Sequence, residues 1–559
     1  TTEQADGLRG VKENKKVRII AAAGSGKTTF LTMCANENPE WSLYLTFNKN
    51  MAEEARNKFP PNVDVRTTHS IAFAYTGRDI AHKLARPRGP YKNVCGTGSE
   101  IARHFRMAPY VLQGGRSISG TAMGYAVRST LARFEQSADK KIGAKHVSFT
   151  EAEKELKNPY FSREEYAARI LKYAEKLWEQ RINPESDIMA THDTYLKMFQ
   201  LQNIGLDGYG RIYLDESHDS NPCLLDIVLK QDLPTVMVGD RYQAIYQWRG
   251  AVDALEKVDW PTFYLTKSFR FGEEIASAAR SVLTDIEGQI LLPVKGNEMK
   301  ESKIVESIES PVYTKIFRTN AALISEGVEM IATGASIALN IDVRDFKNLV
   351  ESVSALKDSV RNESAKKLVK HQDVIPYNSW KEFTEEMEVT GNAELKRVFK
   401  YVEEGIHKEM IEVLDNYIPP SVPNIIFTTA HRSKGLEYNN VILAEDFKYP
   451  EYDKGGQFLG WTDAERNLLY VALTRAKEKL VLNDMVKEVH EDDYSNMQIG
   501  NASISNYLDY EGDLDKSVDT QVMAMAPVSS DEFDLLNGIV KDEENILWED
   551  YSVDVHRPH

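Results

Sequence analysis

A glycine-rich segment near the start of the chain constrains the fold more than any other feature. Residues 17–30 read VRIIAAAGSGKTTF, a short β-branched run followed by small residues and then by a helix-favouring run. This order of strand, loop and helix is typical of a phosphate-binding loop, although Ala21 stands where that pattern usually begins with glycine. Backbone N–H groups of such a loop, with a helix N-terminus behind them, form a nest for phosphates. The predicted phosphate-binding residues are Ala23, Gly24, Ser25, Gly26, Lys27, Thr28 and Thr29.

Four side chains carry the chemistry that this loop predicts. Lys27 would place a positive charge on the β- and γ-phosphates of ATP, and the Thr28 hydroxyl would bind Mg²⁺. Residues 211–214, RIYL, predict a strand that ends at Asp215 and Glu216. Asp215 would hold Mg²⁺ and Glu216 would polarise the attacking water. A chance match in a glycine-rich turn is the alternative, and these later parts of an ATPase argue against it.

Length and composition limit the class of protein. With 559 residues the chain is long enough for three or four compact units, and its hydrophobic fraction of 42% is ordinary for a globular protein. No apolar run approaches the roughly 20 residues that span a bilayer, and no signal peptide is visible, so we expect no membrane partner. Cys34, Cys95 and Cys223 are scattered and suggest neither a four-ligand metal site nor a disulfide framework. We expect a reducing compartment, the cytoplasm, or the nucleus if the source is eukaryotic.

The net charge of −17 is distributed unevenly along the chain. Residues 501–559 carry −11, whereas residues 78–146 carry +9. A basic block within an acidic chain predicts a local contact with a polyanion such as the DNA backbone, and an ordinary solvated surface is the alternative. The acidic tail contains two apolar patches, so we expect a flexible segment that could dock a protein partner. Deleting residues 512–559 should leave the rest folded and active.

Further polar and aromatic side chains follow other predicted strands. Gln243 could sense the γ-phosphate, Phe269 could stack on adenine, and Arg270 could reach the γ-phosphate. Gln4, ahead of the first strand, could pair with the adenine edge. Turn chemistry and buried aromatics are the alternatives at several positions. The side chains suited to phosphate or base contacts on single-stranded DNA are Phe47, Asn48, His69, Tyr246, Trp248 and Arg249.

Taken together, the motifs resemble superfamily 1 DNA helicases of the UvrD/Rep type, and within that group the helicase part of the F-box DNA helicases. The resemblance spans roughly residues 1–490, and no F-box is apparent. The segments that carry it are LYLTFNKNMA, TTHSIA, STLARFEQSAD, VGDRYQAIYQWRGAV, FRTNA, TTAHRSKGLEY and NLLYVALTRAKEKL.

The resemblance implies an α/β fold of two RecA-like (P-loop NTPase) domains with parallel sheets, each carrying a mainly helical insertion. ATP would bind between the domains and single-stranded DNA across their top. The expected divisions are residues 1–77 and 196–275 for the first domain, 78–195 for its basic insertion, 276–340 and 421–500 for the second domain, 341–420 for its short insertion, and 501–559 for the tail.

The resemblance also assigns roles to individual residues. Gln4 and Phe269 would recognise adenine, and Glu437 would contact the nucleotide sugar. Gln243, Arg270 and Arg475 would contact the γ-phosphate, the two arginines as arginine fingers. Arg475 is expected on a helix over residues 465–477. The DNA path would include Phe47, His69, Tyr246, Trp248, Arg249 and His431.

The chain departs from the family pattern in three places. Its second acidic motif reads DESHD, with His218 where glutamine is usual, so the coupling role of that position is open. The second insertion, about 80 residues long, is short for this type. After Arg475 no strand-separating hairpin is evident, so unwinding is less securely predicted than ATP-driven translocation.

The predicted function is an ATP- and Mg²⁺-dependent DNA helicase or translocase that moves 3′ to 5′ on single-stranded DNA or tailed duplexes. Its process would be DNA repair, recombination or replication. Two alternatives stay open. One is a translocase that strips proteins from DNA without unwinding it, and the other is the motor subunit of a nuclease or defence complex.

Overall fold

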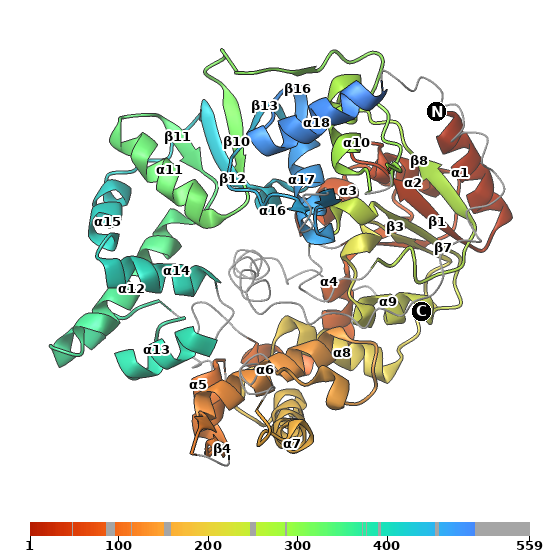
Figure 1. The fold of residues 1–559 in the computed structure, drawn as a ribbon. Coiled ribbons are helices and arrows are strands. Elements are labelled where there is room, and N and C mark those ends of the chain that lie inside the picture. The colour runs from red at the N-terminus through yellow and green to blue at the C-terminus, as the bar shows by residue number, and fades with distance from the viewer. Residues whose placement is uncertain are drawn as a thin grey trace.

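A computed structural model gives the fold of the chain (Figure 1). The structure describes residues 1–46, 49–84, 96–112, 115–149, 158–245, 253–285, 288–371, 373–375, 377–389, 393–452 and 458–497. Several sequence predictions lie outside these ranges, and they concern Phe47, Asn48, Tyr246, Trp248, Arg249 and the tail 501–559.

The first sheet has six strands in the order β3-β2-β6-β7-β1-β8, and all its pairings are parallel. β2 and β7 are buried along their whole length, as expected where helices cover both faces of a parallel sheet. β1 lies between β7 and β8, with Val17 opposite Val236 and Ile19 opposite Phe263. The strands are β1 (Lys16–Ala21), β2 (Ser42–Thr46), β3 (Val63–Thr67), β6 (Arg211–Leu214), β7 (Thr235–Gly239) and β8 (Thr262–Leu265).

One helix, α1, precedes β1, and the others follow strands as βα units require. The packing helices are α1 (Thr2–Glu13), α2 (Lys27–Asn36), α3 (Lys49–Arg56), α4 (Thr68–Ala72) and α9 (Pro222–Leu229). Two 3₁₀ turns, η5 (Ser217–Asp219) and η6 (Arg241–Gln243), follow β6 and β7. Because the carboxyl ends of parallel strands meet at one edge of the sheet, these turns lie beside the glycine-rich loop.

Mainly helical segments separate β3 from β6. Ser162 caps α7 by accepting from the Glu165 N–H, and Tyr166, Ile170 and Leu177 of this helix are buried. A short hairpin, β4 with β5, interrupts the helices. The elements are η1 (a π-helix, Phe73–Gly77), η2 (Arg78–Lys83), α5 (Gly98–His104), β4 (Tyr110–Val111), β5 (Ser117–Ile118), α6 (Gly120–Gln136), η3 (Ala144–His146), α7 (Arg163–Ile182) and α8 (His192–Gln202).

The second sheet repeats the first with six parallel strands in the order β11-β12-β10-β13-β16-β9. Its strands are β9 (Lys303–Ile304), β10 (Tyr313–Phe317), β11 (Ile337–Leu339), β12 (Ile425–Thr429), β13 (Tyr438–Leu443) and β16 (Ala476–Val481). Its helices are α10 (Glu273–Val282), α11 (Asn320–Ala332), α16 (Ala430–Ser433), α17 (Asp463–Leu473) and α18 (Asp484–Met497), with a hairpin of β14 (Glu451–Tyr452) and β15 (Phe458–Gly460).

A smaller group of helices separates β11 from β12 and reaches the first insertion. It comprises α12 (Val343–Asp358), η8 (Glu363–Leu368), α13 (Trp380–Val389), α14 (Ala393–Glu404) and α15 (His407–Asp415). α13 packs against α5 and α6, and an Arg103 guanidinium nitrogen lies 3.7 Å from Glu382 Oε1. The two helical groups therefore touch (Figure 1).

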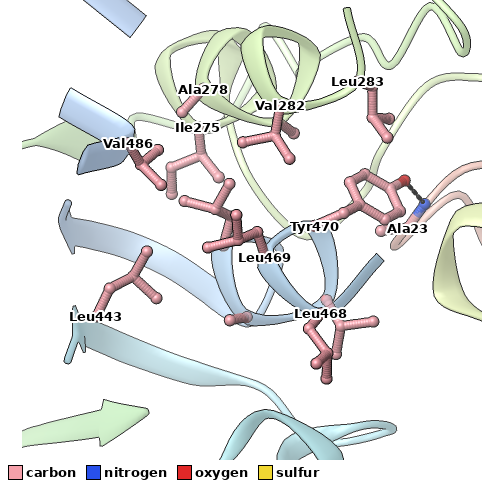
Figure 2. Packing of buried hydrophobic residues seen from close by; sticks show 14 of the residues in the cluster. Ala23, Ile275, Ala278, Val282, Leu283, Leu443, Leu468, Leu469, Tyr470 and Val486 are labelled. Carbon is pink, nitrogen blue, oxygen red and sulfur yellow. Dashed lines mark hydrogen bonds between the residues drawn. The ribbon is translucent and has the colours of Figure 1, made fainter. Parts of the chain in front are cut away.

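A buried apolar cluster joins the two sheets. It contains Ala22, Ala23 and Ile245 from the first domain together with Leu469 and Tyr470 from α17. Figure 2 shows α17 presenting Leu469 towards α10 while Tyr470 reaches the loop at Ala23. The architecture confirms the predicted α/β fold of two RecA-like domains with parallel sheets and helical insertions.

One local difference from the sequence predictions concerns the C-terminal part. The helix expected over residues 465–477 ends at Leu473, and Arg475 lies in the turn before β16, because the parallel pairing of β16 with β13 overrides the helix-favouring residues there. The segment after β16 forms α18. Among the described residues no helix is long and apolar enough to cross a membrane.

Candidate nucleotide site

The glycine-rich loop between β1 and α2 adopts a backbone that its glycines permit. Gly24 and Gly26 have φ angles of +71° and +80°, a region that residues with a Cβ rarely adopt. A Cβ at Gly24 would lie 2.6 Å from Ser268 Oγ and 2.7 Å from Arg270 Cβ. The loop thus requires glycine at this position both for its turn and for its close contact with the segment after β8.

Thr28 and Asp215, the two predicted metal ligands, are in contact. Thr28 Oγ1 donates to Asp215 Oδ2 at 2.9 Å, and the Tyr44 hydroxyl donates to the same oxygen at 2.7 Å. Burial, and then the neighbouring Glu216 carboxylate, raise the pKa of Asp215 to about 6, against the lowering effects of Tyr44 and Lys27. An oxygen pair of this kind suits a hard cation.

Glu216 lies beside Lys27 and His218. Its backbone has a φ of 47°, a strained conformation for a non-glycine residue that often marks a functional position. Oε2 lies 3.8 Å from Lys27 Nζ and 3.5 Å from His218 Nε2. Among the described residues this buried oxygen accepts no hydrogen bond, so it is available to a bound water.

His218 connects the acidic motif to the second domain. Its Nδ1 accepts from the Asp240 N–H at 3.0 Å, and its Nε2 lies 3.1 Å from Lys434 Nζ. Lys434 also donates to Asp219 at 2.6 Å and to the Gln243 carbonyl at 2.7 Å. Burial, and then Lys434 and Lys27, lower the pKa of His218 well below its ordinary value. A neutral imidazole carries one N–H, and because Nδ1 accepts from Asp240 that proton is on Nε2, so Nε2 accepts no hydrogen bond from Lys434.

Gln243 and Arg475, two predicted γ-phosphate residues, meet across the domain boundary. Arg475 donates to Gln243 Oε1 at 3.4 Å and, through Nε, to the Val471 carbonyl at 2.8 Å. Burial, and then the charge of Arg270, lower the pKa of Arg475 to about 9. Gln243 in turn donates to Asp240 Oδ2 at 2.6 Å.

Arg270 and Glu437 form a further contact between the domains at this edge. Arg270 Nε donates to Glu437 Oε2 at 3.1 Å, and its NH1 donates to the Thr474 carbonyl at 2.8 Å. Burial raises the pKa of Glu437, but Arg270 and Lys477 outweigh that effect and hold it below its ordinary value.

The two predicted adenine contacts lie at different depths. The Phe269 side chain is 42% exposed, its ring lies beside Gly26, and its N–H donates to the Gly24 carbonyl at 2.7 Å. Gln4 is buried and forms a capping box with Thr1 at the start of α1. Phe269 thus lies against the loop with an accessible ring, whereas the Gln4 side chain makes a local helix-capping contact.

The donor set fits Mg²⁺ bound together with phosphate. Among the described residues no group of three or more His, Cys, Asp or Glu side chains could hold a metal alone. Mg²⁺ usually takes one or two protein oxygens and completes its shell with water and substrate phosphate. Thr28 and Asp215 supply those oxygens, and the buried Ser25 hydroxyl, which has no hydrogen-bond partner in the described structure, lies in the same loop.

Of the predicted DNA contacts, His69 and His431 lie in the described part. His69 is in α4, directly after β3, and its Nε2 lies 3.3 Å from Asp193 Oδ1. His431 is in α16, directly after β12 of the second sheet. Each is partly exposed at the carboxyl end of a strand, and Figure 1 places both short helices towards the middle of the molecule.

The basic block 78–146 contains two kinds of cation. Arg128 and Arg133 donate to the backbone carbonyls of Gly96 and Val147, so both have structural contacts. Lys140 and Lys141 are exposed. The exposed lysines are therefore the cleaner test of a contact with DNA.

Sequence reasoning missed the residues that support this site. Tyr44, Asp240, Lys434 and Tyr470 contact the predicted site residues, and none was assigned a role from the sequence. Asp240 follows the apolar strand β7 just as Asp215 follows β6, so that pattern could have identified it.

The fold and the site define a nucleotide-binding protein of two RecA-like domains whose facing edges share one site. Residues 128–486, more than half of the chain, match the family model described as "UvrD-like helicase C-terminal domain". The chain therefore belongs to the UvrD-like helicase family, as its motifs predict.

Curated relatives agree with this family. The chain is 29% identical to F-box DNA helicase 1 of Gallus gallus, with 86% of this chain and 48% of the relative covered. It is 29% identical to F-box DNA helicase protein 1 of Schizosaccharomyces pombe, with 85% and 56% covered. It is 26% identical to Gabija protein GajB of Bacillus cereus, with 49% and 63% covered. The chain spans about half the length of the two F-box helicases.

Proposed function

We propose that this chain is an ATP-dependent DNA helicase or translocase that moves 3′ to 5′ along single-stranded DNA. The observation that carries the proposal is the contact between Arg475, which precedes β16 of the second sheet, and Gln243 of the first domain. The first domain also supplies Lys27 and Glu216, which lie 3.8 Å apart. If both domains contribute to the γ-phosphate site, ATP hydrolysis depends on the relative position of the domains, and a motor requires this dependence.

The side chains divide the work of ATP hydrolysis. Lys27 meets phosphate charge, and Glu216, with a buried oxygen that accepts no hydrogen bond within the described residues, would orient the attacking water and accept its proton. Arg270 and Arg475 would stabilise charge on the transferred phosphoryl group. Mg²⁺ held by Thr28 and Asp215 would neutralise phosphate charge when it is bound.

Sequence-tolerant DNA binding is expected where the two sheets end. His69 and His431 offer polar rings after β3 and β12, and Phe47, Asn48, Tyr246, Trp248 and Arg249 would add stacking surfaces and a cation. Stacking of about 1–3 kcal/mol per base does not depend on sequence. We propose DNA repair, recombination or replication as the process.

The deciding experiment measures ATP hydrolysis with and without single-stranded DNA, followed by strand displacement from 3′-tailed and 5′-tailed duplexes. We expect DNA to stimulate hydrolysis and the 3′-tailed duplex to be unwound preferentially. DNA-independent turnover together with inactivity on both duplexes would contradict the proposal.

A second candidate is the motor subunit of a nuclease or defence complex. A translocase that displaces proteins without unwinding is the other alternative. Displacement of a DNA-bound protein measured beside a forked-duplex assay distinguishes unwinding from stripping, and co-purification of a nuclease would favour the complex.

A further inference from the structure

A buried chain of hydrogen bonds crosses between the domains beside the phosphate loop. The Ala23 N–H donates to the Tyr470 hydroxyl at 2.9 Å, and this hydroxyl donates to Asp240 Oδ2 at 3.2 Å. Gln243 Nε2 donates to the same Asp240 oxygen at 2.6 Å, and Gln243 Oε1 accepts from Arg475 at 3.4 Å. Figure 2 shows the first of these bonds, with Tyr470 extending from α17 to Ala23.

The residues of this series of hydrogen bonds alternate between the two domains. Ala23, Asp240 and Gln243 belong to the first domain, whereas Tyr470 and Arg475 lie in or just after α17. Both bonds of the Tyr470 hydroxyl are therefore contacts between domains, and separating the domains breaks them together with the Arg475 bond.

Burial affects the protonation of Tyr470 and Asp240 in this series of hydrogen bonds. Tyr470 and Asp240 are fully buried. Burial, and then the neighbouring Asp240, raise the pKa of Tyr470, so its hydroxyl keeps the proton that it donates. Burial also raises the pKa of Asp240, while Lys27 and Gln243 oppose that effect. A buried polar group that loses its partner is costly, so these bonds favour one arrangement of the domains.

We propose that Tyr470 is a positioning residue that transmits domain closure to the phosphate loop. Its hydroxyl fixes Ala23, the residue before Gly24, and through Asp240 it fixes Gln243 in contact with Arg475. The loop and the arginine finger are then aligned by one contact. This inference rests on the proposed ATPase function and assigns Tyr470 a role in it.

Two substitutions separate this role from simple packing. Tyr470→Phe removes both hydrogen bonds but keeps the ring in the apolar cluster between the domains. Tyr417→Phe is the matched control, because that hydroxyl also makes two bonds, accepting from the Leu339 N–H at 3.0 Å and donating to the Ile337 carbonyl at 3.2 Å. Those bonds lie at β11, within the second domain.

The first measurement is steady-state ATP hydrolysis with saturating single-stranded DNA. We expect Tyr470→Phe to lower kcat about tenfold with KM for ATP within about twofold, because misplacement of a catalytic group affects turnover more than binding. Tyr417→Phe should match the wild type. Gln243→Ala should already break the same series of hydrogen bonds. The fold-decrease in kcat of the double variant should therefore be smaller than the product of the fold-decreases of the two single variants.

The second measurement does not depend on catalysis. Hydrogen exchange of a peptide covering Ala23 should be faster in Tyr470→Phe than in the wild type, and unchanged in Tyr417→Phe. Unchanged exchange, or an unchanged kcat in a variant of an active wild type, would overturn the inference. If the wild type does not hydrolyse ATP, the proposed function is wrong. In that case the hydrogen-exchange measurement alone tests the role of Tyr470.

Discussion

The two sheets share one architecture, but the turns after corresponding strands are filled differently. In the first sheet β1 lies between β7 and β8 and leads through Gly24 and Gly26 into α2. In the second sheet β10 lies between β12 and β13 and leads into α11. There the N–H groups of Arg318 and Thr319 each donate to an Asp446 carboxylate oxygen at 2.8 Å.

This difference shows that, in one fold, the N–H groups at the start of a helix can either bind an external anion or donate to a carboxylate of the same chain. The start of a helix attracts negative charge. The second domain supplies that charge from its own chain through Asp446, which also accepts from the Thr319 hydroxyl at 2.9 Å. The first domain has a glycine-rich turn with Lys27 instead. We therefore expect nucleotide at α2 and none at α11.

The largest expected effect comes from the acid of the first domain. Glu216→Gln should keep nucleotide binding but lower ATP turnover about 100- to 1,000-fold, because the amide cannot accept the proton of the attacking water. Glu445→Gln, at the acid that follows β13 in the second domain, is the control and should retain wild-type turnover. Near-normal hydrolysis by Glu216→Gln in a steady-state assay would remove this residue from the chemistry.

Asp446→Ala should affect stability and leave nucleotide affinity unchanged. It leaves two N–H groups and a hydroxyl at the start of α11 without their acceptor, at a cost of about 1–3 kcal/mol. Urea unfolding and nucleotide titration on the same preparation test both expectations. A variant that binds a second nucleotide, or that loses the first, would contradict the prediction.

His218 should make stability depend on pH. Because the pKa of folded His218 is well below 6.5, the unfolded chain takes up a proton first as pH falls through that value. The stability present above pH 6.5 is therefore lost as pH falls towards the pKa of the folded state. The melting temperature of the wild type should fall more between about pH 7 and pH 5 than that of His218→Gln, whose side chain does not titrate. Parallel curves for the two proteins would argue against this.

The smallest effect concerns DNA. Replacing Lys140 and Lys141 by alanine should weaken DNA binding for all sequences and reduce the slope of its salt dependence by up to about 2. Arg128→Ala with Arg133→Ala is a poorer test, since both arginines hold backbone carbonyls. Fluorescence anisotropy at several salt concentrations gives the slope, and an unchanged slope would place the DNA path elsewhere.

Local sequence patterns predicted much of the site. A strand followed by glycines predicted the glycine-rich turn between β1 and α2, and a strand followed by two acids predicted Asp215 and Glu216 at the end of β6, because both patterns lie within a dozen or so neighbouring residues. The contact of Tyr470 with Asp240 joins residues 230 positions apart, and no local pattern encodes it. The placement of Arg475 after α17 likewise depends on the pairing of β16 with β13, which local helix propensity does not reveal.

The central claim is that one nucleotide binds at the edge of the first sheet and none at the equivalent edge of the second. Calorimetric titration with Mg²⁺ and the slowly hydrolysed analogue ATPγS tests it directly. We predict one nucleotide per chain for the wild type, none for Lys27→Ala, and one for Asp446→Ala. Two nucleotides bound to the wild type, or one retained by Lys27→Ala, would contradict the account.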